Sequence, residues 1–154
     1  MKKLIAGLVF LAAVAGCHSA PPPPPSPSAP PVTGSNVSGA PDATSAVRMY
    51  LKSVEQRDLQ AMGSVWGGPD GPARDLLPRE ELFQREMVMI CTLKHDRYDI
   101  VGEAPTGSSG HAIIVNLFAN GDSRPRIFDV VQGPASRWYV KSVDVKTLTS
   151  CGKG

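Results

Sequence analysis

The sequence predicts an α+β fold with three N-terminal helices packed on an antiparallel sheet of about four strands. Between residues 44 and 91, apolar residues recur every three or four positions, which is the period of amphipathic helices. From residue 98 onward they alternate with polar residues, and Gly-rich or Pro-rich turns separate the segments. Helices followed by a run of hairpin-linked strands indicate the α+β class.

Two helices are expected before residue 67. Asp42 or Thr44 can cap the first, which should run to about Gln56. Its apolar face consists of Val47, Tyr50, Leu51 and Val54. Asp58 can cap a second, short helix. The apolar side of that helix consists of Leu59, Met62, Val65 and Trp66.

A third helix is expected after the Gly- and Pro-rich breaker at residues 67–72. Pro78 suits its first position, and Glu80 and Glu81 suit its first turn, where the helix dipole favours negative charge. Its predicted buried stripe consists of Leu82, Phe83, Met87, Ile90 and Cys91.

Four strands are expected at residues 98–104, 111–119, 126–132 and 137–146. The strand at 111–119 should bury Ile113, Val115 and Leu117 on one face, because side chains alternate between the two faces of a sheet. Asn120-Gly121 is typical of a type I′ turn, so the second and third strands should form a tight hairpin.

The two N-terminal helical segments resemble the opening of the nuclear transport factor 2-like superfamily, in Ala46-Val47-Arg48-Met49-Tyr50-Leu51 and in Asp58-Leu59-Gln60-Ala61-Met62 followed by Trp66. The resemblance covers about residues 43–146 and implies a cone of three helices against a strongly curved antiparallel sheet. Some members are isomerases or cyclases with carboxylates in an apolar cone pocket. Others bind ligands or assemble without catalysis, and many dimerise through their sheet.

The first residues have the pattern of a secretory signal peptide. Lys2 and Lys3 supply the basic region, and residues 4–14 supply an apolar run that is too short to span a bilayer. Val14-Ala15-Gly16-Cys17 then resembles the lipobox of bacterial lipoproteins. The resemblance implies cleavage after residue 16 and a lipid on Cys17. In such proteins an Asp after the cysteine marks inner-membrane retention, and His18 therefore favours the outer membrane, facing the periplasm.

Residues 17–41 are expected to form a disordered, Pro-rich tether, and residues 42–154 the folded domain. The tether is rich in Pro, Ser, Ala and Gly and cannot bury enough apolar area to fold. The chain has 16 basic and 14 acidic residues, and removal of Lys2 and Lys3 with the signal leaves equal numbers. No basic stripe is present, so we expect no nucleic-acid partner.

Cys91 and Cys151 remain once Cys17 carries the lipid. In an exported domain an even pair of cysteines favours a disulfide over a metal site. The alternative is a reactive thiol at Cys91, near the end of the third helix. We expect no cofactor.

The candidate chemistry of the domain is weak. Asp129 is the one acid in the apolar segment 127–131, and it is a potential general base if its face lines the cone. The favoured interpretation is that Asp129 faces solvent or pairs with Arg137 or Lys141. A metal site of His95 and His111 with a nearby Asp is a minor alternative, because no ligand spacing matches a known motif.

The sequence therefore predicts a lipid-anchored cell-envelope protein with no assigned catalytic or metal-binding residue. Its domain is expected to act as a non-catalytic module that binds a small ligand or an envelope protein. One alternative is a small isomerase-, cyclase- or hydratase-like enzyme that uses a carboxylate in the cone. Another is a structural envelope component that forms a homodimer through its sheet.

Overall fold

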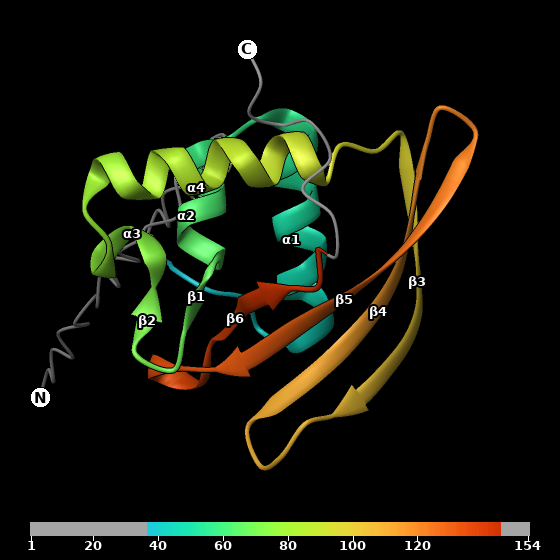
Figure 1. Cartoon of the computed structure of the whole chain (residues 1–154). Helices are drawn as coiled ribbons and strands as arrows, with labels where there is room; N and C mark the ends of the chain where they lie inside the picture. The colour runs from blue at the N-terminus through green and yellow to red at the C-terminus, as the bar shows by residue number, and fades with distance from the viewer. Residues whose placement is uncertain (1–36, 146–154) are drawn as a thin grey trace, which may run out of the picture. The chain divides into compact units, whose positions relative to one another are not determined.

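The computed structural model of the chain describes residues 37–145. The signal at 1–16, the lipidation residue Cys17, most of the tether and Cys151 lie outside the described residues. The described residues belong to one compact unit. In this unit the helices come first and a four-stranded antiparallel sheet follows, which confirms the α+β class (Figure 1).

Two aspartates begin the first two helices, as the sequence predicts. In α1 (Ala43–Gln56), a side-chain oxygen of Asp42 accepts a hydrogen bond from the Ser45 backbone N–H at 2.7 Å. In α2 (Leu59–Val65), Asp58 accepts one from the Ala61 N–H at 3.0 Å. These bonds satisfy N–H groups that have no partner inside the helix. The caps therefore fix where both helices start.

The expected breaker after α2 is a small hairpin. Its strands are β1 (Gly67–Gly68) and β2 (Gly71–Pro72), and they pair antiparallel. A single helical turn that the sequence did not predict, α3 (Ala73–Leu76), follows directly. The last helix, α4 (Arg79–Thr92), has Pro78 as its N-cap.

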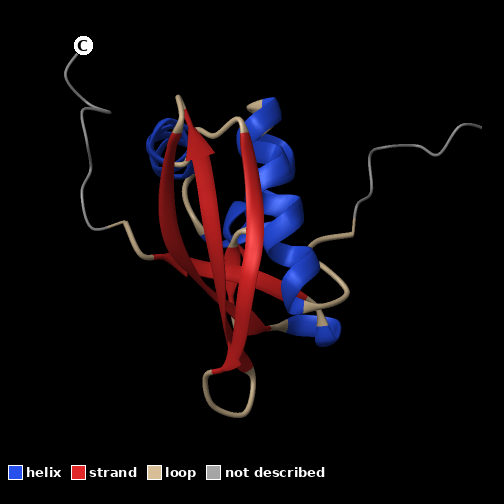
Figure 2. Cartoon of the chain, turned by 90° about the vertical axis from the view of Figure 1, so that its right-hand side faces the viewer, coloured by secondary structure: helices blue, strands red, loops and turns tan. Residues whose placement is uncertain are grey.

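The main sheet has the strand order β3-β4-β5-β6, and all neighbours are antiparallel. The strands are β3 (Arg97–Pro105), β4 (Gly110–Ala119), β5 (Asp122–Gln132) and β6 (Trp138–Val143). Asn120 and Gly121 both have positive φ, which confirms the type I′ turn between β4 and β5. The sheet curves, and the helices lie against one of its faces (Figures 1 and 2).

The core lies between α1 and the inner face of the sheet, which is the face that meets the helices. Tyr50 from α1 meets Phe128 from β5 edge-on, with ring centroids 6.2 Å apart. The aromatic pair and its aliphatic neighbours fill this interface. Its largest fully buried side chains also include Val47, Leu51, Met62, Val65, Leu93, Ile113, Val115, Leu117, Val130 and Val140.

A β-bulge changes which side chains of β3 face the helices. Ile100 pairs with Val115 on the inner face, but the register then shifts, and Gly102 pairs with Ile114 on the outer face. The extra residue between them reverses the alternation for the rest of the strand. As a result, Glu103 lies on the inner face, where strict alternation from Ile100 would place it outside.

The end of the tether is already part of the folded unit. Ala40 is fully buried and forms a bridge to Trp138 on β6. The Gly39 N–H donates to the Ser64 carbonyl at 2.8 Å, and Arg137 donates to the Gly39 carbonyl at 2.7 Å. Ordered packing therefore begins a few residues before Asp42.

The buried face of α4 differs from the predicted one. Ile90 is buried, but Phe83 and Met87 are 47% and 46% exposed, and Cys91 also faces outward. The buried row contains Glu86, which is 2% exposed. The prediction was wrong for Phe83, Met87 and Cys91 because a hydrophobicity pattern assigns an acid to solvent, and this shifted the predicted stripe around the helix.

This rotation of α4 predicts unequal effects of two similar truncations. Ile90→Ala should lower the free energy of unfolding by about 2–4 kcal/mol, because it leaves a cavity in the core. Met87→Ala on the same helix should change it by less than about 1 kcal/mol, because its side chain is largely solvated. Urea denaturation measures both. A loss for Met87→Ala as large as that for Ile90→Ala would contradict the observed rotation.

Candidate functional site

Asp129, the acid that the sequence identified, lies on the outer face of β5. It is exposed and accepts a hydrogen bond from the Ser142 hydroxyl at 2.9 Å. Ile127 shares this face and is 41% exposed. Asp129 therefore points away from the helices and is not in an apolar pocket.

The two histidines considered as metal ligands lie far apart. His95 follows α4, and its Nδ1 is 2.8 Å from the Leu93 carbonyl oxygen. His111 begins β4, opposite the far end of β3. About nine residues of extended chain at ~3.3 Å each separate the two ends. The described residues contain no group of three or more His, Cys, Asp or Glu side chains that could hold a metal.

His111 lies beside Glu103, which the sequence analysis did not identify. Its Nδ1 is 2.6 Å from one carboxylate oxygen of Glu103, although the two atoms are not aligned as a hydrogen bond. The Thr44 hydroxyl donates to the other oxygen at 3.1 Å, and the Trp138 ring meets His111 edge-on at 5.1 Å. The bulge in β3 brings Glu103 to this position. The result is a histidine–carboxylate pair at the rim between α1 and the sheet.

A second acid that sequence reasoning missed, Glu86, lies at the contact between α4 and α2. One carboxyl oxygen, Oε1, is buried and has no hydrogen-bond partner. A Cβ atom on Gly63 of α2 would lie 2.9 Å from that oxygen, so the glycine leaves room for the close approach of the carboxyl. The carboxyl therefore packs against the backbone of α2.

Burial raises the pKa of Glu86 to about 7, with a smaller contribution from the negative charge of Asp58. The Tyr50 hydroxyl is also buried without a hydrogen-bond partner. Burial raises the pKa of Tyr50, and the charge of Glu86 adds to this effect. The surroundings of Glu86 thus favour the protonated carboxyl.

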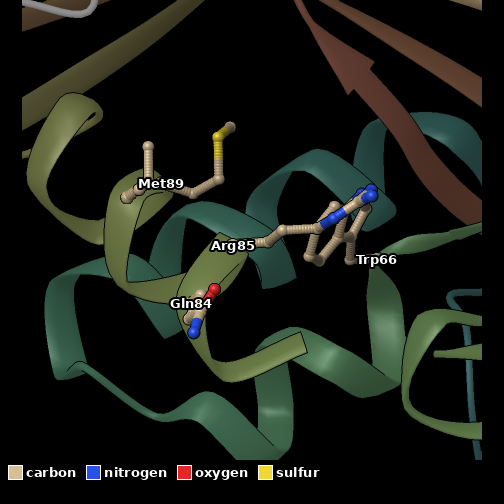
Figure 3. Close-up of a pocket in the computed structure, with 5 residues that line it drawn as sticks. Trp66, Gln84, Arg85 and Met89 are labelled. Atoms are coloured by element: carbon tan, nitrogen blue, oxygen red, sulfur yellow. The ribbon is translucent and has the colours of Figure 1, made fainter. Parts of the chain in front are cut away.

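A shallow pocket lies on the side of α4 that faces Trp66. It has a volume of about 420 Å³ and is lined by Trp66, Gln84, Arg85, Val88 and Met89. Figure 3 shows the side chains of Arg85 and Met89 extending from α4 on this side. We name it the α4 pocket. It combines an apolar floor with two polar side chains, and it opens to solvent.

A second hollow, of about 400 Å³, lies on the other side of α4. Met87, Ile90 and Cys91 line it from α4, and Val54 and Leu59 line it from α1 and α2. Cys91 is disulfide-bonded. Its predicted partner, Cys151, lies outside the described residues, so their pairing stays a prediction.

Comparison with known proteins adds no assignment. The chain matches no protein-family model, and the searches of curated proteins and of solved structures found no match. Within residues 37–145, no helix is long and apolar enough to cross a bilayer.

The environment of Glu86 predicts how stability depends on pH. The pKa of Glu86 in the folded protein, about 7, lies above its ordinary value of 4.5. The folded state therefore keeps a proton that the unfolded chain has lost. Its stabilising contribution is complete below pH 4.5 and is lost as the pH rises through 7. The free energy of unfolding should fall by roughly 3 kcal/mol over this interval.

Glu86→Gln should remove this component, because the amide does not ionise. Urea denaturation at several pH values between 4.5 and 7.5 measures it, with Glu80→Gln, in the exposed first turn of α4, as the control. An identical pH dependence in wild type and Glu86→Gln would contradict the assignment.

Proposed function

We propose that the chain is a lipid-anchored cell-envelope protein whose domain acts as a non-catalytic binding module. The observation that carries the proposal is the α4 pocket, in which Trp66, Val88 and Met89 offer apolar surface to solvent. Pockets of this composition bind apolar groups, and a few polar side chains at the edge orient the ligand. Arg85 and Gln84 are placed for that role.

The ligand that fits these residues is a small molecule or protein segment with an apolar group next to a polar or anionic one. Arg85 forms an ion pair with Glu81 on the same helix, so its charge is partly balanced. Trp66 supplies a large flat surface, and aromatic side chains of this kind are common anchors at interfaces. The domain organisation, the signal and the nuclear transport factor 2-like relationship are part of the same proposal.

A charge placed in the α4 pocket should abolish binding. The probe is 8-anilinonaphthalene-1-sulfonate, which joins an aromatic group to an anion and fluoresces in apolar sites. We expect Val88→Glu to weaken its binding at least about tenfold, because a carboxylate would be desolvated by the dye.

The matched control is Phe83→Glu, which adds the same charge to an exposed position on the same helix outside the pocket. This variant should bind as the wild type does. Equal binding by wild type and Val88→Glu, or equal loss in both variants, would contradict the assignment of the pocket.

The anchor is tested separately in cells. Metabolic labelling with a palmitate analogue should label the wild-type protein and not Cys17→Ser, because the lipid thioether needs a thiol at that position. Cys91→Ser should still be labelled, which controls for the loss of a cysteine elsewhere. Labelling of Cys17→Ser would contradict the proposed anchor.

The enzymatic alternative is favoured by one observation, the pair of Glu103 and His111 at the rim of the sheet. A carboxylate that orients an imidazole is a common arrangement for general acid–base catalysis. Neither residue lines the α4 pocket or the hollow beside Cys91. The binding module is therefore the better supported function.

The structural alternative rests on the outer face of the sheet. Ile114 and Ile127 are paired across β4 and β5 and are 38% and 41% exposed. Two isolated side chains of this kind are normal on a soluble surface. A homodimer through this face remains a proposal with less support than the α4 pocket.

A further inference from the structure

The part of the chain that the structure describes supplies no cation to balance the acid at the contact between α2 and α4. Glu86 is 2% exposed, and its Oε1 is buried without a hydrogen-bond partner. Among residues 37–145, no Lys, Arg or His lies within ion-pair distance of this carboxyl. Burial of an ionised carboxyl without a partner costs several kcal/mol in free energy, so the neutral form suits this site.

The other groups that face Glu86 reinforce this preference. On α1 the facing group is the neutral Tyr50 hydroxyl, and on α2 it is the negative Asp58. On α3, the Cβ of Arg74 lies near Gly63, but its guanidinium is bonded to the Ser38 hydroxyl at 2.7 Å and lies 3.8 Å from Asp75.

On α4 itself, the neighbouring Arg85 is paired with Glu81. Arg74 and Arg85, the two cations nearest to this contact along the chain, therefore have other partners, and the buried site favours the neutral form of Glu86.

Few apolar side chains hold α4 in place. Ile90 is its one buried apolar residue, Leu82, Val88 and Met89 are half-buried, and Leu93 follows at its C-cap. Phe83 and Met87 are largely exposed. A helix with so little apolar burial belongs to the less stable part of a domain. The free-energy difference between the neutral and the ionised form of one buried acid is then large enough to decide whether α4 stays docked.

We propose that Glu86 is a proton-operated lock, which holds α4 against α2 when its carboxyl is protonated and releases the helix when it ionises. In the released state the carboxylate reaches water, and α4 moves away from the backbone of Gly63. The switch needs no cofactor or second ligand. Under this proposal α4 is docked at acidic pH and released at neutral pH.

The size of the effect follows from the two pKa values of Glu86, about 7 when buried and an ordinary 4.5 when released. Between them, each pH unit should raise the ratio of released to docked helix about tenfold. Above pH 7 the ratio becomes constant, because both states are then ionised. Since Val88 and Met89 belong to α4, the lock also sets how often the α4 pocket is assembled, a step that rests on the proposed function.

Hydrogen exchange of the full mature chain tests the lock without any ligand. Protection factors of α4 peptides, corrected for the intrinsic exchange rate, should fall about fifty-fold between pH 5 and pH 7.5. Those of β4 and β5 should change far less. In Glu86→Gln, and in Glu86→Met as a second variant, α4 should be equally protected at both pH values.

Glu80→Gln removes an exposed acid from the same helix and should behave as the wild type does. Protection of wild-type α4 that does not change with pH would overturn the proposal, even if neither variant folds. A change of equal size in Glu86→Gln would also overturn it. Because the α4 pocket is tested by dye binding at one pH, the two proposals can fail independently.

Discussion

The fold depends on a buried carboxyl at the place where α4 meets α2. Gly63 leaves room there, and the carboxyl of Glu86 lies close to the α2 backbone. Burial and the nearby negative charge of Asp58 both favour its protonated form. The hydrophobic core beside it consists of aliphatic and aromatic side chains. The free energy with which α4 is attached to this core therefore depends on the protonation of Glu86.

The same helix carries the surface features that suit binding. Its two flanks form the α4 pocket and the hollow beside Cys91, and Phe83 and Met87 lie exposed on its surface. The interior of the fold offers less space for a ligand, because Tyr50 and its neighbours fill the region between α1 and the sheet. The binding function that we propose is therefore assigned to the outside of the helical layer.

Local signals in the sequence predicted most of the fold, but not the candidate sites. Asp42, Asp58 and the Asn120-Gly121 turn act on their immediate neighbours, so their effects can be read without a structure. The positions of the two acids that the sequence analysis missed, Glu86 and Glu103, depend on packing between distant parts of the chain. Glu86 is buried against Gly63 on another helix, which the hydrophobicity pattern of α4 does not reveal. Glu103 faces inward because of a bulge that alternation cannot reveal.

A direct measurement of the ionisation of Glu86 tests the account most sharply. Carboxyl carbon NMR of the full mature chain, with Glu86 assigned by comparison with Glu86→Gln, gives its titration curve. The account predicts a midpoint near 7 for Glu86, well above the ordinary value of 4.5. A Glu86 midpoint near 4.5 would show that the carboxyl ionises freely in the folded protein, and would contradict the central role given to its burial.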